Sequence, residues 1–471
     1  RFRLLIRMQK DKNLKSTRQN ISFPIYIVAL CIIVIVAINS VIHDPLVGYD
    51  SDGHLDYITV IADHLPTEED SGEFFSPPLP YYIPGIAYQA CVFFADTPLL
   101  QCKLFGGDFA KGVNFFLAMG ITILFIKISR LIKPENKFFT LSALSLLGGM
   151  TVFYKTFSQV RGEPYVAFFT VLVVFLTIKM YNDETNWRYA SLLGITLGLL
   201  VLSRQWGFFL YPAVFFVLVR KNREKIPVSK HLYMVFFTFF VAAVIGGWFY
   251  LHLYFEYGAL TAFNVEAKSF SLSNQPFSFY RNSGFRDFLL FKSPTRKTFD
   301  NQLFPLFYSE IWGDYWGFFI FIREKSPFYA AFANKEQITP YLGRVNFVSL
   351  FPTALLFGGM LVGAKRFFQT ITKKLHKIDT IAFGFFFLAI AISLLGYAWF
   401  LIKYPVHPKG ATIKATYMIQ LFVILPFLAA EFLEFIRMKM PKMYNLFLFL
   451  LGGVFLHNLP AMISRYWWWL R

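Results

Sequence analysis

The chain has 471 residues, of which 56% are hydrophobic and 20% aromatic, and its formal net charge is +18. A soluble domain of this length could not bury so much apolar surface, so the composition excludes an ordinary soluble protein and predicts an all-α integral membrane protein. The charge would suggest nucleic acid in a soluble protein, but here Lys and Arg lie between apolar runs, where they report orientation. No nucleic-acid partner is expected.

Apolar runs that approach the ~17–25 residues of a membrane-spanning helix recur along the whole chain. We expect about eleven transmembrane helices, within a range of roughly 10–13. The expected segments are 24–42, 109–132, 138–154, 164–181, 188–203, 206–219, 231–255, 346–364, 380–402, 414–436 and 444–463. The chain then divides into a cytoplasmic basic tail (1–23), an N-terminal membrane region (24–255) with a first outer loop (43–78), a long outer loop (256–345) and a C-terminal membrane region (346–471).

Charge distribution predicts the orientation of these helices. The basic N-terminal stretch is followed by an apolar run without a small-residue cleavage site, which favours a retained first helix. The region from His43 to Cys102 contains ten acidic residues and no Lys or Arg. The positive-inside rule therefore places the tail in the cytoplasm and the first loop outside. If the eleven segments span and residues 79–95 do not fully cross, the later basic clusters also fall on the cytoplasmic side: 127–137, 220–230, 365–377 and 437–442.

The segment 79–95 is not counted as a span. Pro78, Pro80 and Pro84 lie at its start or within it, and proline breaks the hydrogen-bond ladder of a helix. We expect a re-entrant or half-crossing element, with a twelfth spanning helix as the alternative.

The three cysteines, Cys31, Cys91 and Cys102, lie in or beside apolar stretches. Their spacing does not match a metal site, so we expect small buried residues. They do not indicate the redox state of the compartment.

The stretch YDSDGHLDYI, residues 49–58, concentrates three aspartates and a histidine after the first apolar segment. From Asp52 onward, apolar residues recur at helical spacing, which predicts an amphipathic helix on the outer membrane surface. Asp52 lies near its start, where a carboxylate can cap free backbone N–H groups. Asp50 precedes the helix and is not explained by that pattern. With Tyr49 beside it and His54 one turn away, Asp50 is a candidate general base toward a hydroxyl acceptor.

The Asp-x-Asp spacing has two further interpretations. A metal-nucleotide clamp would need a soluble nucleotide-binding domain, for which the chain has no stretch, and the loop faces the wrong compartment for cytosolic nucleotide sugars. A divalent cation held by Asp50, Asp52 and His54 stays open, although such sites usually recruit oxygen ligands from other segments.

Motifs in a fixed order give the chain a family resemblance. GYDSDGHLDYITVIADHLP, followed by FFSPPLPYYI, resembles the first outer loop of polytopic glycosyltransferases of the C-type (GT-C) superfamily, in the branch of protein O-mannosyltransferases and lipid A aminoarabinose transferases. Further similar motifs are SQVRGEPYVAFF (158–169), LSRQWGFFLYPA (202–213), FPLFYSEIWGDYWGFF (304–319) and IKATYMIQLFVILPFLA (413–429). The resemblance covers most of the chain.

The resemblance implies an inverting enzyme that moves a sugar from a polyprenyl-phosphate carrier to a lipid, glycan or protein acceptor on the outer face of the membrane. It makes Asp50 the catalytic base, with Asp52 and His54 as neighbours that position it, while cationic side chains stabilise the leaving phosphate. The candidate substrate- and phosphate-binding residues are Arg161, Glu163, Arg204, Lys409, Lys414 and Tyr417. A structural Arg161–Glu163 ion pair and a snorkelling Arg204 are the alternatives.

The aromatic segment YSEIWGDYWGFF supplies candidates for sugar or acceptor binding. Its rings would stack on a sugar while its carboxylates bond to hydroxyl groups; an interfacial aromatic belt is the alternative. The candidates are Glu310, Trp312, Asp314 and Tyr315.

Two departures from the family pattern bear on cofactors. Ser51 stands where the family has Glu, although Asp52 could supply a displaced second carboxylate. Phe75-Ser76 replaces a Glu-Lys pair that contributes to metal and phosphate binding in some relatives. The absence of the Glu of that pair favours a mechanism that requires no metal, with a divalent cation as the alternative. The two departures also leave a second hypothesis, a non-catalytic subunit of a larger membrane complex. A transporter is the third hypothesis, which is disfavoured because few charged residues lie within the spans. We expect a bacterial plasma membrane location, with the endoplasmic reticulum as the alternative.

Overall fold

All regular structure in the described part of the chain is helical. The computed structural model describes residues 23–182, 186–219, 228–261, 263, 265–281, 294–295, 301–320, 335–372, 377–406 and 410–465. Within these ranges no strand occurs. The prediction of an all-α protein is therefore confirmed.

The helices follow one another with short connections. The N-terminal half contains α2 (Phe23–Ile42), α3 (Ser51–Val60), α4 (Leu79–Phe94), α5 (Leu99–Ile132), α6 (Lys137–Gly148), α7 (Thr151–Ser158), α8 (Glu163–Asn182), α9 (Trp187–Val201), the 3-10 helix η1 (Gln205–Leu210), α10 (Tyr211–Val219) and α11 (Val228–Tyr257). The C-terminal half contains η2 (Leu272–Asn274), α12 (Phe277–Tyr280), α14 (Leu303–Trp312), α16 (Lys335–Val348), α17 (Leu350–Thr372), α18 (Ile378–Lys403), η3 (Ala415–Met418), α19 (Ile419–Phe422), α20 (Leu425–Lys439), α21 (Pro441–Asn458) and η4 (Leu459–Met462).

The apolar segments predicted from the sequence coincide with these helices. Seven of the described helices are long and apolar enough to cross a membrane, and nine are if each bent pair counts as one span. The bent pairs are α6 with α7, at 61°, and η3–α19 with α20, at 47°. Two shorter apolar helices, α9 and the η1–α10 unit, fill the remaining expected positions. The described residues thus contain seven to nine candidate spans and two shorter apolar helices, and the expected number of about eleven spanning helices stays a prediction.

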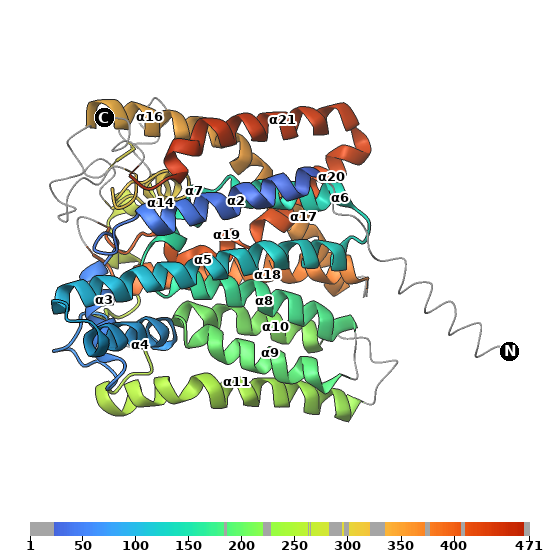
Figure 1. Ribbon diagram of the computed structural model, residues 1–471. Coiled ribbons are helices and arrows are strands. Elements are labelled where there is room, and N and C mark those ends of the chain that lie inside the picture. The colour runs from blue at the N-terminus through green and yellow to red at the C-terminus, as the bar shows by residue number, and fades with distance from the viewer. Residues whose placement is uncertain are drawn as a thin grey trace.

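The long helices lie side by side and give the bundle two ends (Figure 1). At one end lie α3, α4 and α14 (Figure 1). At the other end lie the α5–α6 and α20–α21 turns, which carry Lys133, Lys137, Lys439 and Lys442 (Figure 1). The acidic first loop and these basic turns are therefore separated by the length of the bundle.

Helix α5 is central to the packing. It contacts α2, α4, α6 and α8. Helix α8 also packs against α9, and α9 packs against α11. On the other side of the bundle α20 packs against α6 and α17, and α17 against α18. Peripheral helices keep large apolar side chains exposed, such as Phe255 on α11 and Phe449 on α21. Exposed apolar faces on helices of this length fit contact with lipid.

The first loop folds largely as its periodicity predicts. Helix α3 buries Leu55 and Ile58, which confirms the amphipathic pattern. The helix begins at Ser51, and Asp50 occupies its N-cap position. Asp52 therefore lies within the first turn, and the prediction that it caps the helix is wrong.

Helix α4 and the start of α5 form a hairpin. Helix α4 continues through Pro84, and its 16 residues correspond to about 24 Å, short of the ~30 Å hydrocarbon core. Helix α5 begins at Leu99, ten residues before the predicted segment. A disulfide joins Cys91 to Cys102 across the hairpin, with a Cα–Cα distance of 5.4 Å. The expectation of small buried residues is confirmed for Cys102 and wrong for Cys31 and Cys91, which are partly exposed. The disulfide was not predicted, and Cys31 is free.

Candidate active site

Asp50 is directed away from its own helix by its backbone. Its φ of 55° and ψ of 30° lie in the left-handed region, which aspartate tolerates better than most side chains. An aspartate at an N-cap normally accepts a hydrogen bond from the first helical turn, but the Asp50 side chain makes no such bond. Its Oδ2 instead accepts a hydrogen bond from Lys414 Nζ at 2.7 Å.

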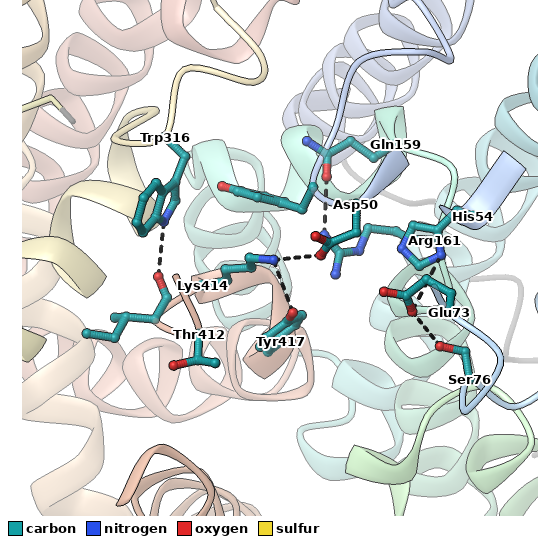
Figure 2. Close-up of polar contacts among 12 residues, drawn as sticks. Asp50, His54, Glu73, Ser76, Gln159, Arg161, Trp316, Thr412, Lys414 and Tyr417 are labelled. Carbon is teal, nitrogen blue, oxygen red and sulfur yellow. Dashed lines mark hydrogen bonds and ion pairs between the residues drawn. The ribbon is translucent and has the colours of Figure 1, made fainter. Parts of the chain in front are cut away.

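Lys414 reaches Asp50 from the far end of the sequence (Figure 2). Its backbone N–H donates to the Tyr397 hydroxyl at 2.9 Å, which fixes the stem of the side chain. Its Nζ also donates to the Tyr417 hydroxyl at 3.2 Å and lies 4.9 Å from the centre of the Tyr49 ring. The Lys414 ammonium holds the pKa of Asp50 well below its usual range. Asp50 is therefore anionic at neutral pH, and 44% of its side chain is exposed to solvent.

Arg161 and Glu163 form a buried two-pronged ion pair at the turn between α7 and α8. The Nε–Oε2 distance is 2.6 Å and the Nη2–Oε1 distance is 2.8 Å. The guanidinium carbon lies 5.4 Å from the centres of both the Tyr49 and the Tyr417 rings. Arg161 thus holds the two tyrosines that flank the Lys414 ammonium, as an arginine can through its planar charged face.

Arg204 precedes η1 and joins three segments of the chain. Its Nη1 donates to Glu73 Oε2 at 3.1 Å and to Ser76 Oγ, and its Nε lies 3.5 Å from Glu163 Oε1. Ser76 donates to the same Glu73 oxygen at 2.6 Å. Two carboxylates therefore compensate the buried Arg204 charge, which would otherwise be costly to desolvate.

His54 lies buried behind Asp50 on α3. Its Nε2 is 3.4 Å from Arg204 Nη2, and its Nδ1 is 2.8 Å from the Tyr81 hydroxyl. Because a guanidinium only donates, Nε2 accepts and Nδ1 carries the proton. Burial lowers the pKa of His54 to about 4, so the ring is neutral at pH 7. His54 can position its neighbours but is not placed to exchange protons with a substrate.

The charged groups open onto a cavity of about 200 Å³. Its polar lining consists of Asp50, Glu73, Arg204, Gln205, Thr412, Lys414 and Tyr417. Its apolar lining consists of Phe75, Trp206, Phe263, Val265, Phe400, Tyr404, Val406 and Ala411. Two carboxylates, two cations and an aromatic wall thus share one small space.

The predicted catalytic residues occupy different positions relative to this cavity. Asp50 lines it, His54 is buried behind it and Asp52 is exposed on α3. Because Asp52 is not a lining residue, the structure does not place it as a second carboxylate. A cation held jointly by Asp50, Asp52 and His54 is not formed either, and among the described residues no group of three His, Cys, Asp or Glu side chains is arranged to hold a metal ion.

The predicted phosphate-binding residues fall into two groups. Arg204, Lys414 and Tyr417 line the cavity, whereas Arg161 and Glu163 are paired with each other beneath it. Lys409 lies outside the described residues.

The predicted sugar-binding residues on α14 and the turn after it do not line the cavity. Glu310 accepts hydrogen bonds from the Tyr49 hydroxyl and from Lys155 Nζ, the latter at 2.6 Å. Asp314 accepts from three backbone N–H groups of residues 318–320. The buried set is Glu310, Trp312, Asp314 and Tyr315. Glu310 ties this segment to Tyr49. Contact of the four residues with a sugar or acceptor stays a prediction.

The lining residues that were not predicted from the sequence include three polar ones, Glu73, Gln205 and Thr412, and most of the aromatic wall, including Trp206. Glu73 lies two residues before Phe75, so the family's Glu-Lys positions do not indicate it. Gln205 and Trp206 directly follow Arg204, and this adjacency was an available signal. Thr412 precedes Lys414 by two residues, and no sequence pattern distinguishes it from other loop threonines.

The fold and the site define a polytopic α-helical membrane protein with a charged cavity built from both halves of the chain. No family model matches the chain. No curated protein matches it either.

Several solved structures are similar to the chain. One is the oligosaccharyltransferase of Archaeoglobus fulgidus in complex with Zn and sulfate, at 15% identity and a TM-score of 0.47, covering 94% of this chain and 53% of that one. The oligosaccharyltransferase AglB of the same organism, with an inhibitory peptide and a dolichol-phosphate, gives 16% identity, a TM-score of 0.43 and coverage of 93% and 56%. ArnT from Cupriavidus metallidurans, in the apo state, has 15% sequence identity and a TM-score of 0.37, and the match covers 86% of this chain and 77% of that one. The chain therefore spans about half the length of the oligosaccharyltransferase chains.

Proposed function

We propose that this protein is an inverting glycosyltransferase that moves a sugar from a polyprenyl-phosphate carrier to an acceptor hydroxyl on the outer face of the membrane. The observation that carries the proposal is the pairing of Asp50 with Lys414 at a cavity that Arg204 also lines. A base and cations side by side are what glycosyl transfer from a phosphate requires. The ordered motifs that resemble the GT-C superfamily support the same reaction.

The reaction proceeds by one displacement at the anomeric carbon. The acceptor oxygen attacks that carbon from the face opposite the carrier, and the bond between the carbon and the phosphate oxygen breaks. The polyprenyl phosphate leaves with the electron pair, and the acceptor proton passes to the Asp50 carboxylate. Lys414 and Arg204 stabilise the negative charge that grows on the phosphate.

Lys414 connects the base to the leaving group. In the structure its ammonium is bonded to Asp50, which makes the carboxylate a weak base. A phosphate bound beside Lys414 competes for the same N–H donors. As the phosphate gains charge, Lys414 bonds to it more strongly, and Asp50 recovers basicity when the acceptor proton must be removed.

The surrounding residues hold this arrangement. Arg161 and Glu163 support the tyrosines around Lys414, and His54 supports Arg204 from behind. We assign no catalytic role to Asp52. The acceptor, whether lipid, glycan or protein, approaches from the outer compartment, which the acidic first loop faces under the positive-inside rule.

The decisive experiment replaces the base. Membranes containing the protein are supplied with radiolabelled polyprenyl-phosphoryl hexoses, and label transferred to endogenous acceptors is measured. Asp50→Asn is expected to lower the rate by about 10²–10⁴-fold, the usual contribution of a general base. Asp52→Asn, two residues away and exposed, is the matched control and should keep the wild-type rate. Full transfer by Asp50→Asn would show that Asp50 is not the base, and no turnover by the wild type would favour a non-catalytic subunit.

A further inference from the structure

We infer that Lys155 and Glu310 position the base, Asp50, by holding Tyr49. The inference rests on the proposed function and adds to it two buried charges that the reaction itself does not use. Tyr49 directly precedes Asp50 in the chain, so a group that holds Tyr49 also holds the backbone from which the Asp50 carboxylate projects. Lys155, Glu310 and Tyr49 are not lining residues of the cavity, and they act through Asp50 as positioning residues.

Lys155 and Glu310 form an ion pair away from solvent. The distance between Lys155 Nζ and Glu310 Oε2 is 2.6 Å, and neither side chain has exposed surface. Lys155 Nζ also donates to the Glu310 carbonyl oxygen at 2.9 Å, and Glu310 Oε1 accepts from the Trp316 backbone N–H at 3.1 Å. Well-packed apolar residues often stabilise a protein as well as a buried ion pair does, because two charges are costly to remove from water. Stability alone therefore does not account for the pair.

The pair fixes the hydroxyl group of Tyr49. This hydroxyl donates to Glu310 Oε2, the same oxygen to which Lys155 is bonded. Burial and the charge of Glu310 raise the pKa of Tyr49 well above its usual value, so the hydroxyl keeps its proton and donates. The Tyr49 ring also packs edge-on against Phe318, with 4.9 Å between the ring centroids. Helix α14 and the turn after it thus hold Tyr49 at both its hydroxyl and its ring.

Asp50 depends on this anchor more than an ordinary N-cap residue would. Its side chain makes no hydrogen bond to the first turn of α3, and its φ of 55° is a conformation that a non-glycine backbone does not favour by itself. The Tyr49 ring also lies 4.9 Å from the Lys414 ammonium, which is bonded to Asp50. Tyr49 therefore restrains both the carboxylate and the cation bonded to it.

Loss of the anchor affects the chemical step and not donor binding. Arg204, which lines the cavity, is held by Glu73 and Glu163, and these contacts are independent of Tyr49. Binding of the donor phosphate at Arg204 therefore remains. The Asp50 carboxylate, in contrast, loses its fixed direction, and a displacement of about 1 Å can lower the rate of a reaction about 10²-fold.

The test is a double-mutant cycle in the transfer assay. Membranes with equal amounts of folded protein, determined by size-exclusion chromatography of detergent extracts, receive radiolabelled polyprenyl-phosphoryl hexoses at several concentrations. Tyr49→Phe removes only the hydroxyl and is expected to lower the apparent kcat about 10–100-fold with the KM for the donor unchanged. Lys155→Met with Glu310→Leu removes the acceptor of that hydroxyl without leaving an unpaired buried charge, and should lower kcat equally. The three changes together should lower kcat no further.

Two further variants separate positioning from a loss of stability. Lys155→Met with Glu310→Gln keeps an oxygen that accepts from the Tyr49 hydroxyl, so it should restore most of the lost kcat. Tyr154→Phe is the matched control. Tyr154 is buried on α7 next to Lys155, and its hydroxyl donates to the Gly148 carbonyl oxygen at 2.8 Å. The variant loses a buried hydrogen bond of the same kind but should keep the wild-type kcat.

The outcomes distinguish this role from the proposed reaction. Wild-type kcat in Tyr49→Phe, or effects that multiply in the triple variant, would overturn the positioning role and leave the reaction standing. A raised KM at unchanged kcat would also overturn it and would assign Glu310 to substrate binding. Equal losses of kcat in Tyr154→Phe and Tyr49→Phe would reduce the effect to stability. No turnover by the wild type would refute the proposed function and the positioning role with it.

Discussion

At the scale of single residues, the site depends on side chains that are buried with a defined protonation state. His54 accepts a hydrogen bond from Arg204 and donates one to Tyr81, which requires the neutral ring. Protonation would place a second positive charge against a guanidinium. Burial, together with that charge, lowers the pKa of His54 to about 4.

This lowered pKa predicts a pH dependence of stability. Between pH 6.5 and pH 4 the unfolded chain binds a proton at His54 that the folded protein does not, so the free energy of unfolding rises with pH through this window. At pH 5 the loss relative to pH 7 is about 2 kcal/mol from this residue. Thermal denaturation in detergent at pH 5 and pH 7 measures it. His54→Gln should reduce the difference between the two pH values, and His64→Gln, at an exposed histidine of the same loop, should not. An unchanged difference in His54→Gln would show that the folded protein protonates this ring at its ordinary pKa.

At the scale of elements, the site is held by the contact between two turns. The α7–α8 turn carries Arg161 and the α9–η1 turn carries Arg204, and the two backbones meet at Gly162. A Cβ atom at Gly162 would lie 2.3 Å from Ser203 O and 2.9 Å from Arg204 Cγ. Any side chain there must push one turn away from the other.

Gly162→Ala is therefore expected to destabilise the protein by about 1–3 kcal/mol, as overpacking does, and to lower activity by displacing Arg204. Thermal denaturation and the transfer assay measure the two effects. Gly247→Ala on α11 is the control, because a Cβ there meets no neighbouring atom within 4 Å and alanine favours the helix. Equal stability of the two variants would mean that the turns are not in contact.

The comparison of helices and site residues with the sequence shows which features could be predicted from it. Long apolar runs predict helices because a bilayer requires a minimum length of about 20 residues and internal hydrogen bonds for every backbone group. The predicted segments therefore coincide with observed helices. Asp50 could be found because its position between an apolar run and an amphipathic helix is visible locally. Gln205 could not be predicted as a cavity residue, because the cavity forms only when Lys414, about two hundred residues later in the chain, lies across from it. The Cys91–Cys102 pair was missed because spacing alone does not reveal that α4 and α5 form a hairpin.

At the scale of the whole molecule, two independent features bear on which compartment the site faces. Basic residues gather at the α5–α6 and α20–α21 end of the bundle, which the positive-inside rule assigns to the cytoplasm (Figure 1). The Cys91–Cys102 disulfide belongs to the hairpin of α4, at the opposite end, and disulfides persist in oxidising compartments outside the cytosol. Charge and redox chemistry therefore both agree with the predicted orientation, in which the first loop lies outside.

This orientation predicts the labelling of single cysteines by a maleimide that does not cross membranes. In a Cys31→Ala background, which keeps the disulfide, Glu69→Cys in the first loop should react from the outside of sealed cells. Lys442→Cys at the start of α21 should react only after permeabilisation. Both positions are exposed, so access to reagent and not burial decides the result. Labelling of both variants in sealed cells, or the reverse pattern, would contradict the orientation. It would also place Asp50 on the side where polyprenyl-phosphate sugars are not expected to be consumed.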